Sequence, residues 1–240
     1  MTKIELLVLN RRKDSSRCEE MITVIEMHNI KKAYDSHIVF DEVSLSIQEG
    51  DRVAIIGRSG SGKSTLLNII GLLDKPTSGK YLLNGKENIS IYSSSARKIL
   101  RYKIGYLFQN YALLENETVE TNMKIAMRYG KYKDKEASIS EALDLVGLKA
   151  TERRKIHTLS GGEQQRIALA RLLVKPCSLI LADEPTGNLD EDNTEIIMNL
   201  LLSFSKKGKT VVMVTHNQSV LHHFDKVINL DEFVPDGNRV

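Results

Sequence analysis

One eight-residue stretch, Gly57 to Ser64, constrains this chain more than any other. It reads GRSGSGKS and matches the pattern G-x-x-x-x-G-K-[ST] at every fixed position. Residues 52–56 before it predict a buried strand, and residues 65–70 after it predict a helix. Glycines let a loop wrap closely around an anion, and the helix N-terminus adds partial positive charge. The stretch therefore predicts a phosphate-binding loop, with Lys63 on the β- and γ-phosphates and the Ser64 hydroxyl on Mg²⁺.

Composition limits what surrounds this loop. The 240 residues are 41% hydrophobic and 27% charged, which is enough for one large α/β domain. The net charge is only +3, tryptophan is absent and aromatic residues make up 5%, so we expect no nucleic-acid partner. Cys18 and Cys177 share no metal-site spacing, which favours a reducing compartment. No apolar run approaches the ~20 residues that cross a bilayer, so a membrane role would need a partner protein.

The chain before the loop begins with an uninformative segment. Residues 1–20 lack the long apolar core and small-residue cleavage site of a secretory signal, so residues 1–23 are predicted to be an extension, with Met21 an alternative start. Alternating apolar residues at 25–30 and 43–47 predict strands. Tyr34 falls in the loop expected after the first strand. It can stack on an adenine ring or lie partly buried at a sheet edge, and the residues alone leave both open.

The chain after the loop predicts a second sheet and a group of helices. A turn at 76–79 is followed by a short apolar run and by Asn84-Gly85, a strong hairpin signal. These pieces predict an antiparallel sheet beside the nucleotide site. Residues 119–129 and 137–146 predict helices, the second ending at Gly147. The basic residues at 131–135 and 153–155 are expected to form solvated faces.

The next buried strand is predicted at residues 104–108, and a polar amide comes directly after it. Gln109 follows it directly, at the end of a core strand where α/β folds place ligand contacts. Taken alone, Gln109 fits a solvated strand end equally well.

A second predicted helix N-terminus can bind an anion. Ser160 and Glu163 have the spacing of a capping box, so a helix is expected to begin here. Gly161 and Gly162 in its first turn leave backbone N–H groups uncovered. An ordinary glycine-containing cap is the alternative.

Acidic and imidazole side chains follow the last two predicted core strands. The apolar run 178–182 leads into Asp183 and Glu184, which should point to opposite sides as consecutive strand residues do. One carboxylate can then face Mg²⁺ and the other a water in line with the γ-phosphate. The strand at 210–215 ends at His216, which can hydrogen-bond a phosphate oxygen.

In this order and spacing, and together with Leu159–Gln164 and Asn188-Leu189-Asp190, the motifs resemble the ATP-binding subunits of ABC transporters. The resemblance covers residues 24 to about 233, and the Leu-Ser-Gly-Gly-Glu signature is far more specific than the phosphate loop. It implies an α/β P-loop NTPase fold over residues 24–235, with a mostly parallel core sheet, an antiparallel β-subdomain and an inserted α-helical subdomain at about 110–157. Residues 182–190 look most like the branch of the macrolide-exporter, lipoprotein-release and cell-division ATPases. Residues 115–119 look like bacteriocin-export or antimicrobial-peptide-resistance subunits.

The resemblance also implies a role for each motif residue, with ATP and Mg²⁺ as cofactors. Glu184 would be the general base, helped by His216 and Gln109, and the metal ligands would be Ser64, Gln109 and Asp183. The signature would bind the γ-phosphate of ATP held by a second subunit. The nucleotide-binding residues implied are Tyr34, Gly57, Arg58, Ser59, Gly60, Ser61, Gly62, Lys63, Ser64, Thr65, Ser160, Gly161, Gly162, Glu163 and Asp190.

The function implied is that of an ATP-hydrolysing transporter subunit at the cytoplasmic face of the membrane. It would form a head-to-tail homodimer around two ATP molecules and power export of a peptide, lipoprotein or antimicrobial compound through a separate permease. A second hypothesis is a regulatory module that acts on a membrane protein without moving a substrate. A soluble ABC ATPase of ribosome or DNA maintenance is disfavoured, because such proteins usually carry two cassettes or a long coiled-coil insertion.

Overall fold

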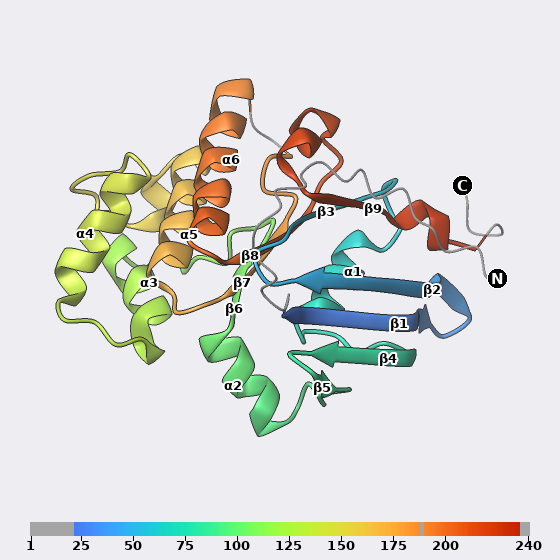
Figure 1. Ribbon diagram of the computed structural model, residues 1–240. Helices are drawn as coiled ribbons and strands as arrows, with labels where there is room; N and C mark the ends of the chain where they lie inside the picture. Colours follow the sequence, from blue (N-terminus) through green and yellow to red (C-terminus); the bar gives the residue numbers. More distant parts are fainter. Residues whose placement is uncertain (1–21, 188–189, 236–240) are drawn as a thin grey trace, which may run out of the picture.

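The computed structural model describes residues 22–187 and 190–235, arranged as two sheets with helices around them (Figure 1). Residues 1–21 of the predicted extension, and Asn188 and Leu189, lie outside the described residues. The strands are β1 (Thr23–Tyr34), β2 (His37–Gln48), β3 (Arg52–Ile56), β4 (Ser78–Leu83), β5 (Lys86–Glu87), β6 (Ile104–Leu107), β7 (Leu179–Asp183), β8 (Thr210–Val214) and β9 (Lys226–Asn229). The α-helices are α1 (Lys63–Ile70), α2 (Ser94–Tyr102), α3 (Val119–Ala126), α4 (Lys135–Leu145), α5 (Gly161–Val174) and α6 (Glu191–Lys206). Short 3₁₀ helices are η1 (Met127–Tyr129), η2 (Ile156–Thr158), η3 (Gln218–His223) and η4 (Leu230–Phe233).

A parallel sheet with strand order β6-β7-β8-β3-β9 forms the centre of the molecule. Its inner strands β7, β8 and β3 are mostly apolar and buried, because both faces of the sheet are covered there. In β7, Leu179 and Leu181 pack into the core that contains α1 and the antiparallel strands, whereas Ile180 and Ala182 pack against α5 and α6. The predicted buried strands before Gly57, Asp183 and His216 are therefore the middle of this sheet.

The second sheet is antiparallel, with strand order β2-β1-β4-β5. Asn84 and Gly85 form the predicted hairpin turn, both with positive φ. Tyr34 is the last residue of β1 rather than part of a loop, because β1 and β2 continue through register shifts that break the alternation. Gly79, expected in a turn, belongs to β4. A Cβ there would lie 2.4 Å from the Asn29 carbonyl oxygen, so this glycine marks a close approach of two strands.

The helices between β6 and α5 form a separate apolar cluster against α5 (Figure 1). The helix predicted at 119–129 divides into α3 and η1. Helix α4 begins at Lys135, before the predicted Ala137, because the Asp134 side chain caps it by accepting the Ala137 N–H at 2.9 Å. Gly147, with φ +71°, ends α4 as predicted. In the described part of the chain, no helix has both the length and the apolar character needed to cross a membrane.

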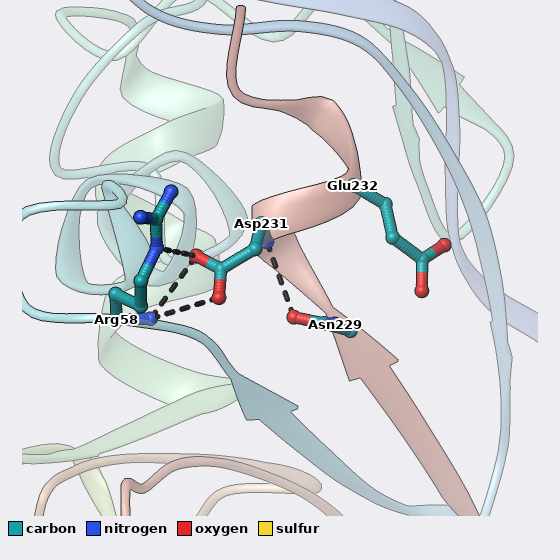
Figure 2. A pocket seen from close by; sticks show the side chains of 4 residues that line it. All are labelled: Arg58, Asn229, Asp231 and Glu232. Atoms are coloured by element: carbon teal, nitrogen blue, oxygen red, sulfur yellow. Dashed lines mark hydrogen bonds and ion pairs between the residues drawn. The ribbon is translucent and has the colours of Figure 1, made fainter. Parts of the chain in front are cut away.

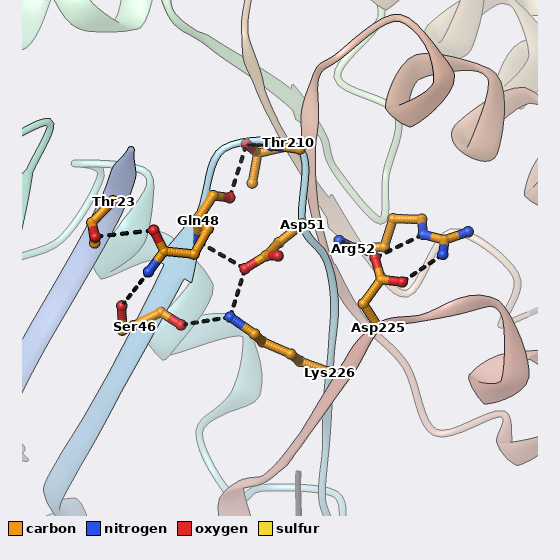
Figure 3. A network of polar contacts seen from close by, with 9 residues as sticks. Thr23, Ser46, Gln48, Asp51, Arg52, Thr210, Asp225 and Lys226 are labelled. Atoms are coloured by element: carbon orange, nitrogen blue, oxygen red, sulfur yellow. Dashed lines mark hydrogen bonds and ion pairs between the residues drawn. The ribbon is translucent and has the colours of Figure 1, made fainter. Parts of the chain in front are cut away.

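A network of polar contacts joins the two sheets at the amino ends of the parallel strands (Figure 3). The Gln48 N–H donates to the Asp51 carboxylate at 2.7 Å, and the Lys226 ammonium contacts the same oxygen at 2.7 Å. The Gly50 N–H donates to the Thr210 hydroxyl at 3.0 Å. The end of β2 is thereby fixed to the starts of β3, β8 and β9, opposite the edge that carries the motif residues.

The two sheets also meet at Gly62, immediately before α1. Its φ is +91°, and a Cβ would lie 2.4 Å from Val39 Cγ1 and 2.9 Å from Phe40 Cδ1. The substitution Gly62→Ala should therefore cost about 2–5 kcal/mol of folding free energy, from the left-handed backbone and the clash together. Gly50→Ala is the matched control, because its φ is +81° and its Cβ would meet nothing within 4 Å. Urea unfolding should show a cost of only about 1–2 kcal/mol for the control, and equal losses in both variants would contradict the packing argument.

The ion pair between Arg52 and Asp225 gives a pH dependence to stability (Figure 3). Hydrogen bonds from the Arg52 side chain lower the pKa of Asp225, burial opposes them, and the Arg52 backbone N–H lowers it further. A lowered folded-state pKa means that the stabilisation is complete above the ordinary value of about 4 and is lost as the pH falls through the folded-state value. Both side chains are about a third or more exposed, so the effect should stay below about 1 kcal/mol.

The substitution Asp225→Asn tests this dependence. Its loss of stability relative to the unsubstituted chain should be greatest at pH 7 and should shrink as the pH falls toward 3, measured by urea unfolding across that range. The exposed Glu141, changed to Gln, serves as control. A difference that stays constant with pH would show that the charge of Asp225 does not contribute.

Candidate functional site

The carboxyl ends of all the strands in the parallel sheet carry polar residues at one edge, where ligands bind in open α/β sheets. In sheet order, these residues are Gln109 after β6, Asp183 and Glu184 at the end of β7, His216 after β8, the glycine loop 57–62 after β3, and Asp231 after β9. All except Asp231 were singled out from the sequence. The parallel topology thus brings together residues that are far apart in the chain.

Glycines give the loop after β3 its shape. The φ angle is +153° at Gly57, +80° at Gly60 and +91° at Gly62, a region that other residues rarely adopt. Ser59 is exposed near the tip of the loop, and Thr65 lies half-buried in the first turn of α1. Backbone N–H groups from the loop and from the start of α1 therefore line a concave turn that suits an anion.

Lys63 places a buried positive charge in this loop. Only 6% of the residue is exposed, and its Nζ donates to the carbonyl oxygens of Gly57 at 3.0 Å and Arg58 at 2.8 Å. The hydroxyl of Ser61 is buried and has no hydrogen-bond partner among the residues that the structure describes. A buried cation held by uncharged carbonyls, beside an unsatisfied donor, fits a site for a phosphate group.

Ser64 and Asp183 form a pair of oxygen ligands next to the loop. The Ser64 hydroxyl donates to Asp183 Oδ1 at 2.9 Å. Burial raises the pKa of Asp183, and Glu184 raises it further, while the Ser64 hydrogen bond and Lys63 act in the opposite direction. Within residues 22–187 and 190–235, no group of three His, Cys, Asp or Glu side chains is arranged to hold a metal. A hydroxyl and a single carboxylate fit Mg²⁺, which usually keeps waters and shares its coordination with phosphates.

Glu184 departs from the strand that precedes it. It was predicted as a strand residue, but β7 ends at Asp183 and Glu184 has φ +46°. Its N–H donates to the Val214 carbonyl at 3.0 Å, which holds this unusual backbone in place. Glu184 Oε2 lies 3.4 Å from Nδ1 of His216. Asp183 and Glu184 therefore face different partners, so a carboxylate beside a hydroxyl and a carboxylate beside an imidazole follow each other in the chain.

Gln109 lies in an exposed turn after β6, and a side chain of α5 holds the residues that follow it. Tyr111 and Ala112 have φ values of +62° and +46°. The guanidinium of Arg171, on α5, donates to the Tyr111 carbonyl at 2.6 Å and to the Ala112 carbonyl at 2.5 Å. Sequence reasoning missed Arg171, because an arginine in a helix gives no sign of such a contact.

The predicted capping box at the start of α5 is present. Ser160 N–H donates to Glu163 Oε2 at 2.7 Å, and Glu163 N–H donates to the Ser160 hydroxyl at 3.3 Å. The Ser160 backbone N–H is the main cause of the lowered pKa of Glu163, and Arg154 adds to it at 3.1 Å. Arg154 is therefore an ion-pair partner as well as part of a solvated face. A Cβ on Gly161 or Gly162 would meet no described atom within 4 Å, so the described part of the chain leaves this helix end open.

Asp190 caps the next helix and is linked to α5. Its side chain accepts the Asn193 N–H at 2.8 Å at the start of α6. Asn193 Oδ1 in turn accepts from Arg166 of α5 at 3.2 Å. The preceding residues of this motif, Asn188 and Leu189, lie outside the described residues.

Tyr34 at the end of β1 is 51% exposed, so a ring face is available to a ligand. Its hydroxyl donates to Asp74 Oδ2 at 2.9 Å, and the Lys32 ammonium lies 4.4 Å from the ring centroid. Neither contact was expected from the sequence.

Asp231 is a further residue of the site that the sequence did not indicate (Figure 2). Its carboxylate accepts the Arg58 backbone N–H at 3.0 and 3.2 Å, and Arg58 Nε lies 3.7 Å from Oδ1. Together with Asn229 and Glu232, these two residues line an open pocket of about 340 Å³. The peptide group between Gly57 and Arg58 is thus held on both sides, its oxygen by Lys63 and its N–H by Asp231.

Comparison with known proteins gives consistent matches. The profile of the ABC transporter family matches residues 40–187. The uncharacterized ABC transporter ATP-binding protein YvrO of Bacillus subtilis is 40% identical over 223 residues, which cover 90% of this chain and 96% of YvrO. The macrolide export ATP-binding/permease protein MacB of Chlorobaculum tepidum is 40% identical over 90% of this chain, but this chain spans only 34% of that protein.

Solved structures agree. The dimeric ABC transporter cassette MJ0796 matches with a TM-score of 0.77 and 36% identity, over 86% of this chain and 94% of that one. A dimeric post-hydrolysis state of the same cassette, bound to ADP and Pi, matches with a TM-score of 0.77 over 85% of this chain and 93% of that one. These matches confirm the predicted α/β fold class. By sequence and by fold, this chain belongs to the ABC transporter family, as an ATP-binding and ATP-hydrolysing cassette.

Proposed function

We propose that this cassette is the ATPase subunit of an export system and works on a permease formed by another chain. The observation that carries the proposal is the gathering of the phosphate loop, the Ser64–Asp183 pair and the Glu184–His216 pair at one edge of the parallel sheet. Phosphoryl transfer to water needs a phosphate cradle, oxygen ligands for Mg²⁺ and a positioned base, and this edge supplies all three.

Each group at the edge has a proposed task in nucleotide binding. Lys63 and the loop N–H groups hold the β- and γ-phosphates, and Tyr34 stacks on the adenine. Ser64 and Asp183, with Gln109, would hold Mg²⁺, which offsets the negative charge of the phosphates when bound. The buried and otherwise unsatisfied Ser61 hydroxyl supports the assignment, because a phosphate oxygen would give it a partner.

Glu184 is the proposed general base. Its carboxylate orients the attacking water and accepts its proton, and His216, 3.4 Å from Glu184, donates a hydrogen bond to the γ-phosphate. The positive φ of Glu184 supports this role, since strained backbone at the end of a core strand is typical of functional positions.

We propose further that two copies assemble head to tail around two ATP molecules. The open start of α5 at Ser160, Gly161 and Gly162 offers N–H groups and no covering side chain, as a γ-phosphate bound by another subunit would require. Asp190 lies at a helix start joined to α5 and would connect the two sites. The dimeric state of the related MJ0796 cassette supports such an arrangement. Hydrolysis removes the γ-phosphate that bridges the subunits, and the dimer opens.

The permease contact is assigned to the helical subdomain at about 110–157 of an ATPase domain covering residues 24–235, at the cytoplasmic face of the membrane. The printed name of the MacB relative, which combines ATP binding with a permease, supports a membrane partner. The proposed cargo is a peptide, lipoprotein or antimicrobial compound, selected by the permease.

The substitution Glu184→Gln tests the base. It keeps the shape of the side chain but cannot accept a proton, so ATP hydrolysis should fall by about 10²–10⁴-fold. The dissociation constant for ATP should change little, and ATP should now hold a dimer during size-exclusion chromatography. Glu195→Gln, at an exposed position of α6, is the matched control and should keep normal turnover. Normal turnover in Glu184→Gln would remove Glu184 from the reaction.

Affinity purification from membranes tests the partner. The Glu184→Gln variant with ATP should hold the closed dimer, and mass spectrometry should recover a permease with several membrane spans. Substrate-dependent export from vesicles would then separate export from a purely regulatory role. Recovery of ribosomal or DNA-repair proteins without a membrane protein would overturn the proposed function.

A further inference from the structure

The ammonium group of Lys32 is almost completely buried near the end of β1. Only 6% of the residue is exposed, and Nζ contacts Asp74 Oδ1 at 2.8 Å, Asp74 Oδ2 at 2.8 Å and the Lys75 carbonyl at 3.0 Å. A buried charge is costly unless it is paired and hydrogen-bonded, and this one is both. The site described above leaves this pair without a role.

The pair reaches Tyr34 in two ways. The Tyr34 hydroxyl donates to Asp74 Oδ2 at 2.9 Å, which fixes the far end of the ring. The Lys32 ammonium lies 4.4 Å from the ring centroid and so occupies one face as a cation–π contact. Although Tyr34 is 51% exposed, its ring is held at an edge and at a face, and the opposite face remains for a flat ligand.

Asp74 carries a full charge in this cluster. Burial raises its pKa, but hydrogen bonds from the Lys32 ammonium, the Tyr34 hydroxyl and the Lys75 N–H lower it more, and the net pKa is lowered. Asp74 is therefore an anion at neutral pH and accepts from Lys32 and Tyr34 together.

The cluster is also tied to the phosphate loop. Asp74 follows α1, the helix that begins at Lys63, and its N–H donates back to the Asn68 carbonyl at 3.2 Å. The hydroxyl of Thr77 accepts the Ala33 N–H at 2.9 Å, which joins the same segment to β1. The position of the Tyr34 ring is thus set relative to the helix that presents the phosphate site.

We propose that Lys32 and Asp74 are positioning residues for the nucleotide base, because they fix the Tyr34 ring with one face open at a set place relative to the phosphate loop. This inference rests on the proposed nucleotide site. An exposed ring that is already held in place loses less conformational freedom when a base stacks on it, so binding is tighter.

Two ligands separate a role toward the base from a role in the fold. ADP carries the base and is not hydrolysed by this reaction, whereas inorganic pyrophosphate carries only phosphates. Titration calorimetry with Mg²⁺ should show that Tyr34→Ala weakens ADP binding by roughly 5–150-fold, as loss of base stacking does. Lys32→Met, Asp74→Asn and Tyr34→Phe should each weaken it by roughly 3–10-fold, with pyrophosphate affinity unchanged.

Lys31→Met is the matched control. Lys31 neighbours Lys32 but pairs with Asp41 on β2, so both affinities should stay at their normal values. Tyr34→Phe removes only an exposed hydroxyl, so it keeps the test valid if the buried Lys32 or Asp74 variants fail to fold.

The remaining outcomes are distinct. Unchanged ADP affinity in Tyr34→Phe and Asp74→Asn would overturn the positioning role while leaving the nucleotide site intact. Equal weakening of ADP and pyrophosphate would also overturn it, because the pair would then act only on the fold around α1. If the unsubstituted chain bound neither ligand, the proposed nucleotide site would fail, and this inference with it.

Discussion

The site depends on the contacts of the buried Lys63 ammonium with its own loop. Among the described residues, its hydrogen bonds go to carbonyl oxygens of its own loop, which orient it without neutralising its charge. A cation in that position is stabilised further by an anion, and the N-terminus of α1 favours the same sign of ligand. The loop is held in the required shape from outside, by Asp231 on the Arg58 N–H and by the packing of Gly62 against β2. Contacts within the chain therefore set the shape of the proposed phosphate cradle.

The two ends of the parallel sheet have different physical characters. At the amino ends, charged and hydroxyl groups with hydrogen-bond partners cross-link β2, β3, β8 and β9 (Figure 3). At the carboxyl ends, Glu184, Tyr111 and Ala112 have positive φ, and the buried Ser61 hydroxyl has no partner in the described part of the chain. Such conformations persist only where surrounding structure over-determines them. The contacts at the amino ends fix the starts of the strands that carry these groups.

Local patterns in the sequence were enough to predict the buried core strands, the phosphate loop, the Asn84–Gly85 hairpin and the capping box, because each depends on residues close together in the chain. The parallel order of the core strands came only from the family resemblance. Local patterns were not enough for Asp231, Arg171 or the Lys32–Asp74 pair. Those side chains act through partners 40 or more residues away, and a lysine, arginine or aspartate in a strand, helix or turn has no spacing that distinguishes it. Glu184 was placed in a strand for a related reason, since its positive φ is imposed by the contact with Val214 on β8.

Helix α5 links the parts of the site that the sequence presented as separate motifs. Near its start, the buried Gln165 donates to the Pro185 carbonyl, one residue after Glu184, and Arg166 holds Asn193 beside Asp190. Farther along, Arg171 holds the turn that follows Gln109. One continuous α-helix of 14 residues therefore begins at Gly161 and contacts the turn after Gln109. In the proposed nucleotide site, α5 would connect the turn after Gln109 with the helix start offered to a second nucleotide, through its side-chain contacts as well as through its exposed signature.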